Sequence, residues 1–272
     1  MALTKVLITV KTYPAISSKY YELVCTAGFR EDGSWIRIYP VQFRKKAYSE
    51  QYSKWQWIEL DLVKNTSDPR PESYRPKSHD TPIFIHDNIK PDGDAWHERR
   101  KFALNKIYTN KKTLIAEAKN KNVATSLAVF KPSRITDFKI ELVDREWGKE
   151  KIESLRQMNL FDTSEHDKTQ VVRKLPYKFS YTFLDDAGES STLMIEDWEI
   201  GQLYWNSLAR HEGNEAKATH DVEKKYFDDF AKTKDLHLFL GTTMLHHFRA
   251  PNPFVVIGTF HPKRIFQTQL FI

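Results

Sequence analysis

The sequence has a single cysteine, Cys25, among its 272 residues, and this scarcity excludes several kinds of protein. One thiol cannot form a disulfide within the chain or build a cysteine-based zinc cluster. It fits a reducing compartment, where disulfides are rare. No run approaches the roughly 18 apolar residues of a membrane helix, and the first residues lack the apolar core and cleavage site of a signal peptide. We therefore expect a soluble, cytoplasmic protein with no membrane partner.

Glycine and proline are also few, at 9 and 12 residues, which argues against a long disordered tail. Glycine-rich phosphate loops, the His-Glu-x-x-His zinc motif and the Gly-x-Ser-x-Gly nucleophile turn are all missing from the sequence. Their absence weakens the case for a P-loop hydrolase, a Rossmann dehydrogenase or an ordinary serine hydrolase. The sequence leaves the cofactor unknown, and it nominates no metal-ligating residues.

Positive charge is concentrated in the first half of the chain. Residues 1–136 contain 24 Lys or Arg against 14 Asp or Glu, a net of +10, and residues 137–272 contain 18 against 22, a net of −4, which together give the overall +6. A basic half joined to an acidic half suggests that the first half binds a polyanion. The alternative is an uneven distribution of lysines with no such partner.

Hydrophobic patterns predict an α+β protein. The first 63 residues offer about four strands and no convincing helix, which favours an OB-like or β-barrel region followed by a basic helix over Trp96–Lys119. Later patterns predict a mixed antiparallel sheet with helices. The polar stretch Asn159–Gln170 places a boundary near residue 165. We therefore expect a basic, β-rich OB-like domain over 1–165 and an acidic α+β domain over 166–272.

A predicted hairpin, Val24 to Phe43, is the strongest functional signal. Its turn contains Asp32-Gly33, and Trp35, Arg37 and Tyr39 alternate with aliphatic residues on the second strand. An aromatic–arginine–aromatic face suits base stacking and phosphate neutralisation. The proline-rich segment Asp68–Pro76 is predicted as an extended loop rather than a central strand. Together with the basic helix, these segments supply the candidate nucleic-acid-binding residues Trp35, Arg37, Tyr39, Arg44, Arg70, Tyr74, Arg75, Arg99 and Arg100.

Four residues are candidates for chemistry. Asp197 and Glu199 lie at a predicted strand-to-helix junction, where carboxylates can act as a base or simply cap the helix. His237 lies on a predicted strand and could face a cleft or be structural. Cys25 could be a nucleophile if its pKa were lowered, or a buried apolar side chain. The sequence leaves these alternatives open.

The hairpin also carries a family resemblance. Cys25-Thr-Ala-Gly28 followed by Asp32-Gly-Ser-Trp35-Ile-Arg37 resembles the opening of the dual OB-containing domains, which occur in bacterial proteins of nucleic-acid modification and phage conflict. This chain departs from that pattern because Ile38 and Tyr39 separate the arginine from Pro40. The resemblance covers roughly the first 45 residues and implies an OB-like barrel and a nucleic-acid partner.

The leading hypothesis is therefore a nucleic-acid-binding protein of a bacterial DNA modification or phage-defence system, with DNA favoured over RNA and partner proteins possible from the same operon. The alternative is an enzyme that acts on a nucleobase or nucleotide in DNA, with its site in the acidic C-terminal half. A third hypothesis is a protein-interaction adaptor.

Overall fold

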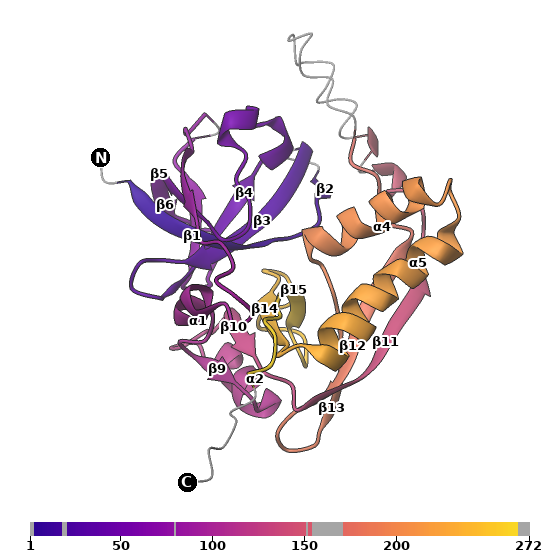
Figure 1. Cartoon of the computed structure of the whole chain (residues 1–272). Helices are drawn as coiled ribbons and strands as arrows, with labels where there is room; N and C mark the ends of the chain where they lie inside the picture. The colour runs from indigo at the N-terminus through magenta and orange to yellow at the C-terminus, as the bar shows by residue number, and fades with distance from the viewer. Residues whose placement is uncertain (1–2, 18–20, 79, 151, 154–170, 266–272) are drawn as a thin grey trace.

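The computed structural model describes residues 3–17, 21–78, 80–150, 152–153 and 171–265, which form three sheets with helices packed around them (Figure 1). The strands are β1 (Thr4–Lys11), β2 (Ala15–Ser17), β3 (Tyr21–Phe29), β4 (Trp35–Val41), β5 (Gln56–Leu60), β6 (Leu62–Lys64), β7 (Ser73–Pro76), β8 (Phe84–Asn88), β9 (Ile107–Tyr108), β10 (Leu127–Phe130), β11 (Arg134–Leu142), β12 (Tyr177–Leu184), β13 (Ser190–Met194), β14 (His237–Thr242) and β15 (Phe254–Phe260). The helices are α1 (His97–Ala103), α2 (Lys111–Lys119), α4 (Trp198–Arg210) and α5 (Glu215–Glu223), with short 3₁₀ turns η1 (Phe43–Lys45) and η2 (Tyr48–Glu50) and the π-helical segment η4 (Lys224–Ala231).

The N-terminal sheet is a curled half-barrel with the strand order β6-β7-β4-β3-β1-β5-β8, and β2 pairs with β3. The predicted hairpin is confirmed as β3 and β4. The Asp32 carboxylate accepts a hydrogen bond of 2.9 Å from the Ser34 amide, and Gly33 has a φ of 79°. Asp-Gly thus closes the turn, because glycine adopts positive φ at no steric cost.

Both faces of β4 are covered. Ile36 and Ile38 pack inside the half-barrel against Val6 and Ile8. The opposite face packs against the four-stranded sheet β15-β14-β10-β9, where the rings of Trp35 and Phe239 are 5.7 Å apart. The face that we expected to meet bases is therefore largely an internal packing surface.

The four-stranded sheet lies in the middle of the molecule, between the N-terminal sheet and the C-terminal helices (Figure 1). Alternate residues of β14 point to opposite faces, as strand geometry requires. Phe239 packs toward the N-terminal sheet, whereas Leu238 and Leu240 join a second core with Tyr181 and Tyr204. That second core is enclosed by the antiparallel sheet β11-β12-β13 and by helices α2, α4 and α5.

The fold class is confirmed: the chain is α+β, with a curled N-terminal sheet and mixed sheets with helices after it. The single helix predicted over Trp96–Lys119 is wrong, because β9 interrupts it. Ile107 and Tyr108 pair in parallel with Val129 and Phe130, so their backbone groups are satisfied by a sheet. The Asn110 side chain then accepts a hydrogen bond of 3.0 Å from the Thr113 amide and starts α2 as a separate helix.

The segment predicted as a proline-rich loop also needs correction. Residues 73–76 form β7, which lies between β4 and β6 within the N-terminal sheet. Pro71 precedes this strand and Pro76 is its last residue, so neither ring interrupts its centre. The predicted domain boundary at residue 165 lies outside the described residues.

The predicted helix cap at Asp197 is confirmed, and Asn214 caps the next helix in the same way. The Asp197 side chain accepts from the Glu199 amide at 3.4 Å at the start of α4, and the Asn214 side chain accepts from the Lys217 amide at 3.0 Å at the start of α5. None of the helices in the described part of the chain is long and apolar enough to cross a membrane.

We expect Phe239→Ala to lower the free energy of unfolding by about 3–5 kcal/mol, because it opens a cavity where the N-terminal sheet meets β14. The Phe239 side chain is fully buried. Phe84, which is 47% exposed on β8, is the matched control, and its alanine variant should cost less than about 1 kcal/mol. Urea unfolding of both variants measures the difference, and equal losses would contradict the packing described.

Candidate functional site

The predicted binding residues on β4 are less accessible than expected. Trp35 is partly buried and its ring lies 4.0 Å from that of Phe29. Arg37 is only 1% exposed. Tyr39 is partly buried near the end of the strand. The expectation that Arg37 presents its guanidinium to a phosphate is wrong for this conformation, because strand alternation identifies a shared face but not what covers that face.

Arg37 and Arg70 instead join the two halves of the chain. The Arg37 guanidinium donates hydrogen bonds to the Ser126 hydroxyl at 2.6 Å and to the Ser126 carbonyl at 3.1 Å. Both arginines also donate to the carbonyl oxygen of Thr242, at the end of β14. Arg70 is 4% exposed and its Nε donates to Asp68 at 2.8 Å. We call Arg37, Arg70, Asp68, Glu72, Ser126 and Thr242 the arginine cluster.

Asp68, Ser126 and Thr242 provide most of the partners of the two buried arginines. Burying an arginine costs less when it is paired and hydrogen-bonded. Here Asp68 pairs with Arg70, and Ser126 and the Thr242 carbonyl accept from Arg37, whose Nε is buried without a partner among the described residues. The segment Gly241-Thr242-Thr243 at the end of β14 provides the Thr242 carbonyl that accepts from both arginines. The Glu72 carboxylate accepts from the Ser126 hydroxyl at 2.8 Å and completes the cluster. Its role is to hold the fold together.

The basic residues after β8 are also paired within the molecule. Arg99 is 9% exposed and donates to the Ile89 carbonyl at 2.7 Å, so it is not available to a phosphate. Arg100 donates to Asp235 at 2.9 Å. Lys111 and Lys112 both lie beside Glu189 of the C-terminal half. Carboxylates that are distant in sequence therefore pair with Arg100, Lys111 and Lys112 of the segment predicted as a basic helix.

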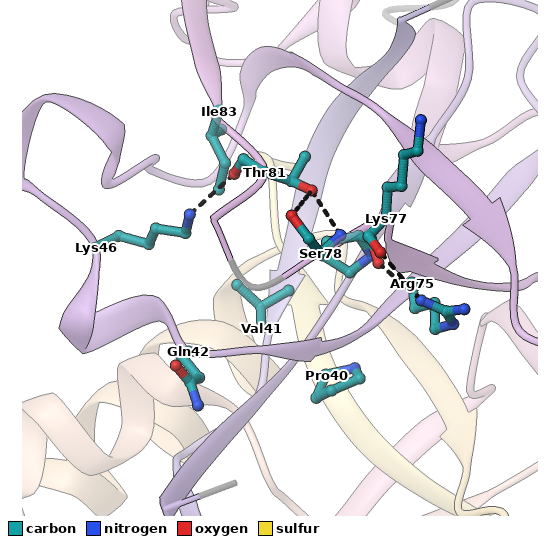
Figure 2. A pocket seen from close by; sticks show the side chains of 10 residues that line it. Pro40, Val41, Gln42, Lys46, Arg75, Lys77, Ser78, Thr81 and Ile83 are labelled. Atoms are coloured by element: carbon teal, nitrogen blue, oxygen red, sulfur yellow. Dashed lines mark hydrogen bonds between the residues drawn. The ribbon is translucent and has the colours of Figure 1, made fainter. Parts of the chain in front are cut away.

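Arg75 and the lysines near it mark the best candidate for a binding site. A pocket of about 220 Å³ opens where β4 and β7 end (Figure 2). Lys46 and Arg75 lie on opposite sides of it, with Ser78 and Thr81 between them, as Figure 2 shows. The lining residues are Pro40, Val41, Gln42, Lys46, Arg75, Pro76, Lys77, Ser78, Thr81 and Ile83. We call this site the basic pocket, because its lining contains three cations and no carboxylate.

Internal hydrogen bonds give the basic pocket a defined shape. Lys46 donates to the Thr81 carbonyl at 2.9 Å, and the Ser78 amide donates to the Thr81 hydroxyl at 2.9 Å. Arg75 donates to the carbonyls of Pro76 and Lys77 at 3.3 Å each. Asp61, outside the lining, lies 3.5 Å from Lys77 across a half-exposed ion pair. Such exposed pairs are weak, so Lys77 can still attract an anion.

Three other predicted binding residues lie close by in the chain. Tyr39 immediately precedes the pocket residue Pro40, and Arg44 lies two residues before Lys46. Tyr74 precedes Arg75 and is held between two cations, with the Arg30 guanidinium 4.8 Å and the Lys64 ammonium 4.9 Å from its ring centre. The structure thus brings Tyr39, Arg44, Tyr74 and Arg75 to one region and leaves Arg37, Arg70 and Arg99 inside.

The four candidate catalytic residues do not form one site, because only Asp197 and Glu199 lie together. Asp197 and Glu199 are brought together by Lys54, whose ammonium lies 2.7 Å from the first carboxylate and 3.0 Å from the second. His237 is 4% exposed, and burial, with Lys131 nearby, lowers its pKa to about 4. Cys25 is partly buried, and its amide donates to the Thr12 hydroxyl at 3.1 Å. His237 therefore stays neutral in the physiological range, without an arrangement that activates it.

The Lys54–Asp197–Glu199 triad is the feature that sequence patterns missed. Burial raises the pKa of Asp197 to about 6 even though the Lys54 ammonium opposes this shift. Burial also disfavours the charged form of Glu199, but Lys54 outweighs it and lowers the Glu199 pKa. One oxygen of Asp197, Oδ2, is buried with no hydrogen-bond partner. Lys54 comes from the loop before β5, 143 residues away, and no local motif marks it.

A metal ion is not indicated at this triad. An ammonium group already lies between the two carboxylates, and the described residues contain no group of three or more His, Cys, Asp or Glu suited to a metal. The triad therefore consists of one ammonium group between two carboxylates.

Two family models match the chain, and each is described as a domain of unknown function. DUF8758 matches residues 2–105, and DUF8757 matches residues 108–272. The second covers more than half of the sequence, so the chain belongs to the DUF8757 family. Neither description names the dual OB-containing domains, so that resemblance stays a prediction. A comparison with curated proteins found no match.

We expect Lys54→Met to lower the free energy of unfolding by about 3 kcal/mol at pH 8, because it leaves the buried Asp197 carboxylate without its partner. The loss should be smaller at pH 5. The pKa of Asp197 is already raised to about 6 in the folded protein, and without Lys54 it rises further. The folded state then binds a proton more tightly than the unfolded state, so the penalty grows as the pH rises.

Urea unfolding at pH 5 and pH 8 measures this difference. The double variant Lys54→Met with Asp197→Asn should recover part of the loss, since it removes both buried charges. A loss for Lys54→Met that is the same at both pH values would contradict the assignment.

Proposed function

For this member of the DUF8757 family, we propose that the protein binds a nucleic-acid strand through the basic pocket on its curled N-terminal sheet. The observation that carries the proposal is the composition of the pocket wall: Lys46, Arg75 and Lys77 line it, and no carboxylate does. Phosphate oxygens are the anions that such a set of donors attracts, and backbone phosphates supply most of the affinity of nucleic-acid complexes.

The remaining lining suits the uncharged parts of a nucleotide. Pro40, Val41 and Ile83 offer apolar contacts for a base or sugar, and Ser78 and Thr81 offer hydroxyl groups. The volume of about 220 Å³ far exceeds the roughly 10–15 Å³ that one water needs, yet it is below the usual ~300–1,000 Å³ of small-molecule pockets. One nucleotide unit of a longer strand fits this range better than a large independent ligand.

Neighbouring residues would extend the contact along the strand. Tyr39, which immediately precedes Pro40 and is partly buried, provides a ring beside the pocket on which a base can stack, and Arg44 adds charge near it. Base stacking tolerates any sequence, so we expect weak sequence preference and a strong dependence on salt. Through the resemblance of residues 25–37, the proposal extends to a role in bacterial DNA modification or phage defence, with DNA favoured over RNA.

The test is a triple variant, Lys46→Ala with Arg75→Ala and Lys77→Ala, titrated against a fluorescent 20-nucleotide single strand of DNA over a salt series. If three phosphate contacts are lost at about 0.7 each, the slope of log K against log salt should become shallower by about 2. RNA and duplex DNA of the same sequence serve as further ligands.

The matched control removes the same charge elsewhere. Lys119, Lys121 and Lys139 are exposed, and replacing all three with alanine should leave the salt slope nearly unchanged. If the control weakens binding as much as the pocket variant, binding is diffuse and the pocket has no special role. If neither protein nor variant binds any strand, the proposed function is wrong.

A further inference from the structure

Tyr48 lies on the surface of the protein, in the turn that follows the basic-pocket residue Lys46. It begins η2, and 92% of its surface is exposed, whereas no other large apolar residue in the described part of the chain exceeds 64%. At that exposure the ring packs on almost nothing within the chain, so it adds little to the stability of the fold. The ring is therefore available to a ligand.

The backbone around Tyr48 is held in place by hydrogen bonds. The Tyr48 carbonyl accepts from the Gln51 amide at 3.2 Å, and the Gln51 side chain donates to the Lys46 carbonyl at 2.9 Å. The Glu50 carboxylate accepts from the Ile83 amide at 3.1 Å and ties η2 to another lining residue of the basic pocket. The ring thus has a fixed point of attachment beside the pocket, which lowers the entropic cost of binding.

The ring also lies close to positive charge. Lys46 is two residues before Tyr48, so at most about 7 Å separates their Cα atoms. Arg44 and Lys45 directly precede Lys46, and the lining of the basic pocket contains no carboxylate. Surfaces that bind single-stranded nucleic acid combine cations for the backbone with aromatic rings for the bases. An apolar patch of a partner protein would use only the ring, whereas a polynucleotide uses the ring and the cations.

We infer that Tyr48 stacks on an unpaired base of the strand whose phosphates bind the basic pocket, and that the protein therefore prefers single strands to duplexes. This role rests on the proposed strand binding. In a duplex both faces of each base are covered by its neighbours, and exposing one face costs unstacking and unpairing energy. In a flexible single strand, a base next to the bound phosphate turns toward the ring at a much lower cost.

Three substitutions separate the aromatic ring from the other features of Tyr48. Tyr48→Ala removes the ring, Tyr48→Phe keeps it without the hydroxyl group, and Tyr48→Leu keeps apolar bulk without an aromatic face. Phe84→Ala is the matched control. Phe84 is also an exposed ring next to a lining residue, but strand alternation turns it away from the buried Ile83. Both sites are exposed, so all four variants should fold, and urea unfolding checks this.

Each protein is titrated with the same fluorescent single strand of DNA over the same salt series. Tyr48→Ala should bind about 5- to 150-fold more weakly, the range that one stacked base contributes. Tyr48→Leu should show most of this loss, whereas Tyr48→Phe and Phe84→Ala should bind as the wild type does. The ring is uncharged, so its loss should shift the line of log K against log salt without changing the slope. An equal loss for Phe84→Ala would overturn the specific role of Tyr48.

Two further ligands test whether the ring contacts a base. The first is a strand of the same length made entirely of abasic nucleotides, and the second is duplex DNA. The wild type and Tyr48→Ala should bind each of these with equal affinity, because neither ligand presents an unpaired base. The same loss for Tyr48→Ala with intact, abasic and duplex ligands would overturn the inference, since the ring would then act on the backbone or on the shape of the pocket.

Two outcomes separate the stacking role from the proposed strand binding. If the wild type binds single strands with a salt slope that depends on the pocket cations, but Tyr48→Ala binds equally well, the stacking role is wrong and the proposed function stands. If the wild type binds no strand, both are wrong.

Discussion

The guanidinium groups of Arg37 and Arg70 meet at the carbonyl oxygen of Thr242, and the remaining structure depends on this contact. It connects the half-barrel to the last residue of β14, while the rings of Phe29, Trp35 and Phe239 pack beside it. Two buried cations would be costly in isolation. Asp68, Ser126 and backbone carbonyls provide the partners that make their burial possible. The two family matches meet between residues 105 and 108, yet the parts of the chain that they cover share one interior.

Buried or partly buried cations find partners from the other half of the chain elsewhere in the protein as well. The acidic second half supplies carboxylates to cations of the basic first half: Asp235 to Arg100 and Lys131, Glu189 to Lys111, and the triad carboxylates to Lys54. Much of the charge asymmetry seen in the sequence is thus satisfied within the molecule. The basic pocket gathers Lys46, Arg75 and Lys77 on one wall, and although Asp61 lies 3.5 Å from Lys77, none of the described lining residues is a carboxylate. The proposed function rests on this local gathering of cations rather than on the net charge.

Local signals could be predicted from the sequence. The Asp32-Gly33 turn, the caps at Asp197 and Asn214, and the α+β class depend on residues close together in the chain. The prediction that Arg37 is exposed was wrong because β14, which packs over it, follows about 200 residues later in the chain. The prediction of one helix over 96–119 was wrong because the backbone of β9 pairs with β10, although the apolar residues there have helical spacing. No local motif marks Lys54, because its carboxylate partners Asp197 and Glu199 lie at the start of α4, about 143 residues away in the chain.

The β4 face is a packing surface, and the proposed site for a strand is the basic pocket. Hydrogen exchange with and without single-stranded DNA tests this most directly. Amides of residues 35–38 should exchange slowly in both states, since the Arg37 amide donates to the Glu72 carbonyl at 2.8 Å within the sheet, and residues 40–46 and 75–83 should gain protection when the strand is added. New protection of residues 35–38 with none at residues 75–83 would contradict it.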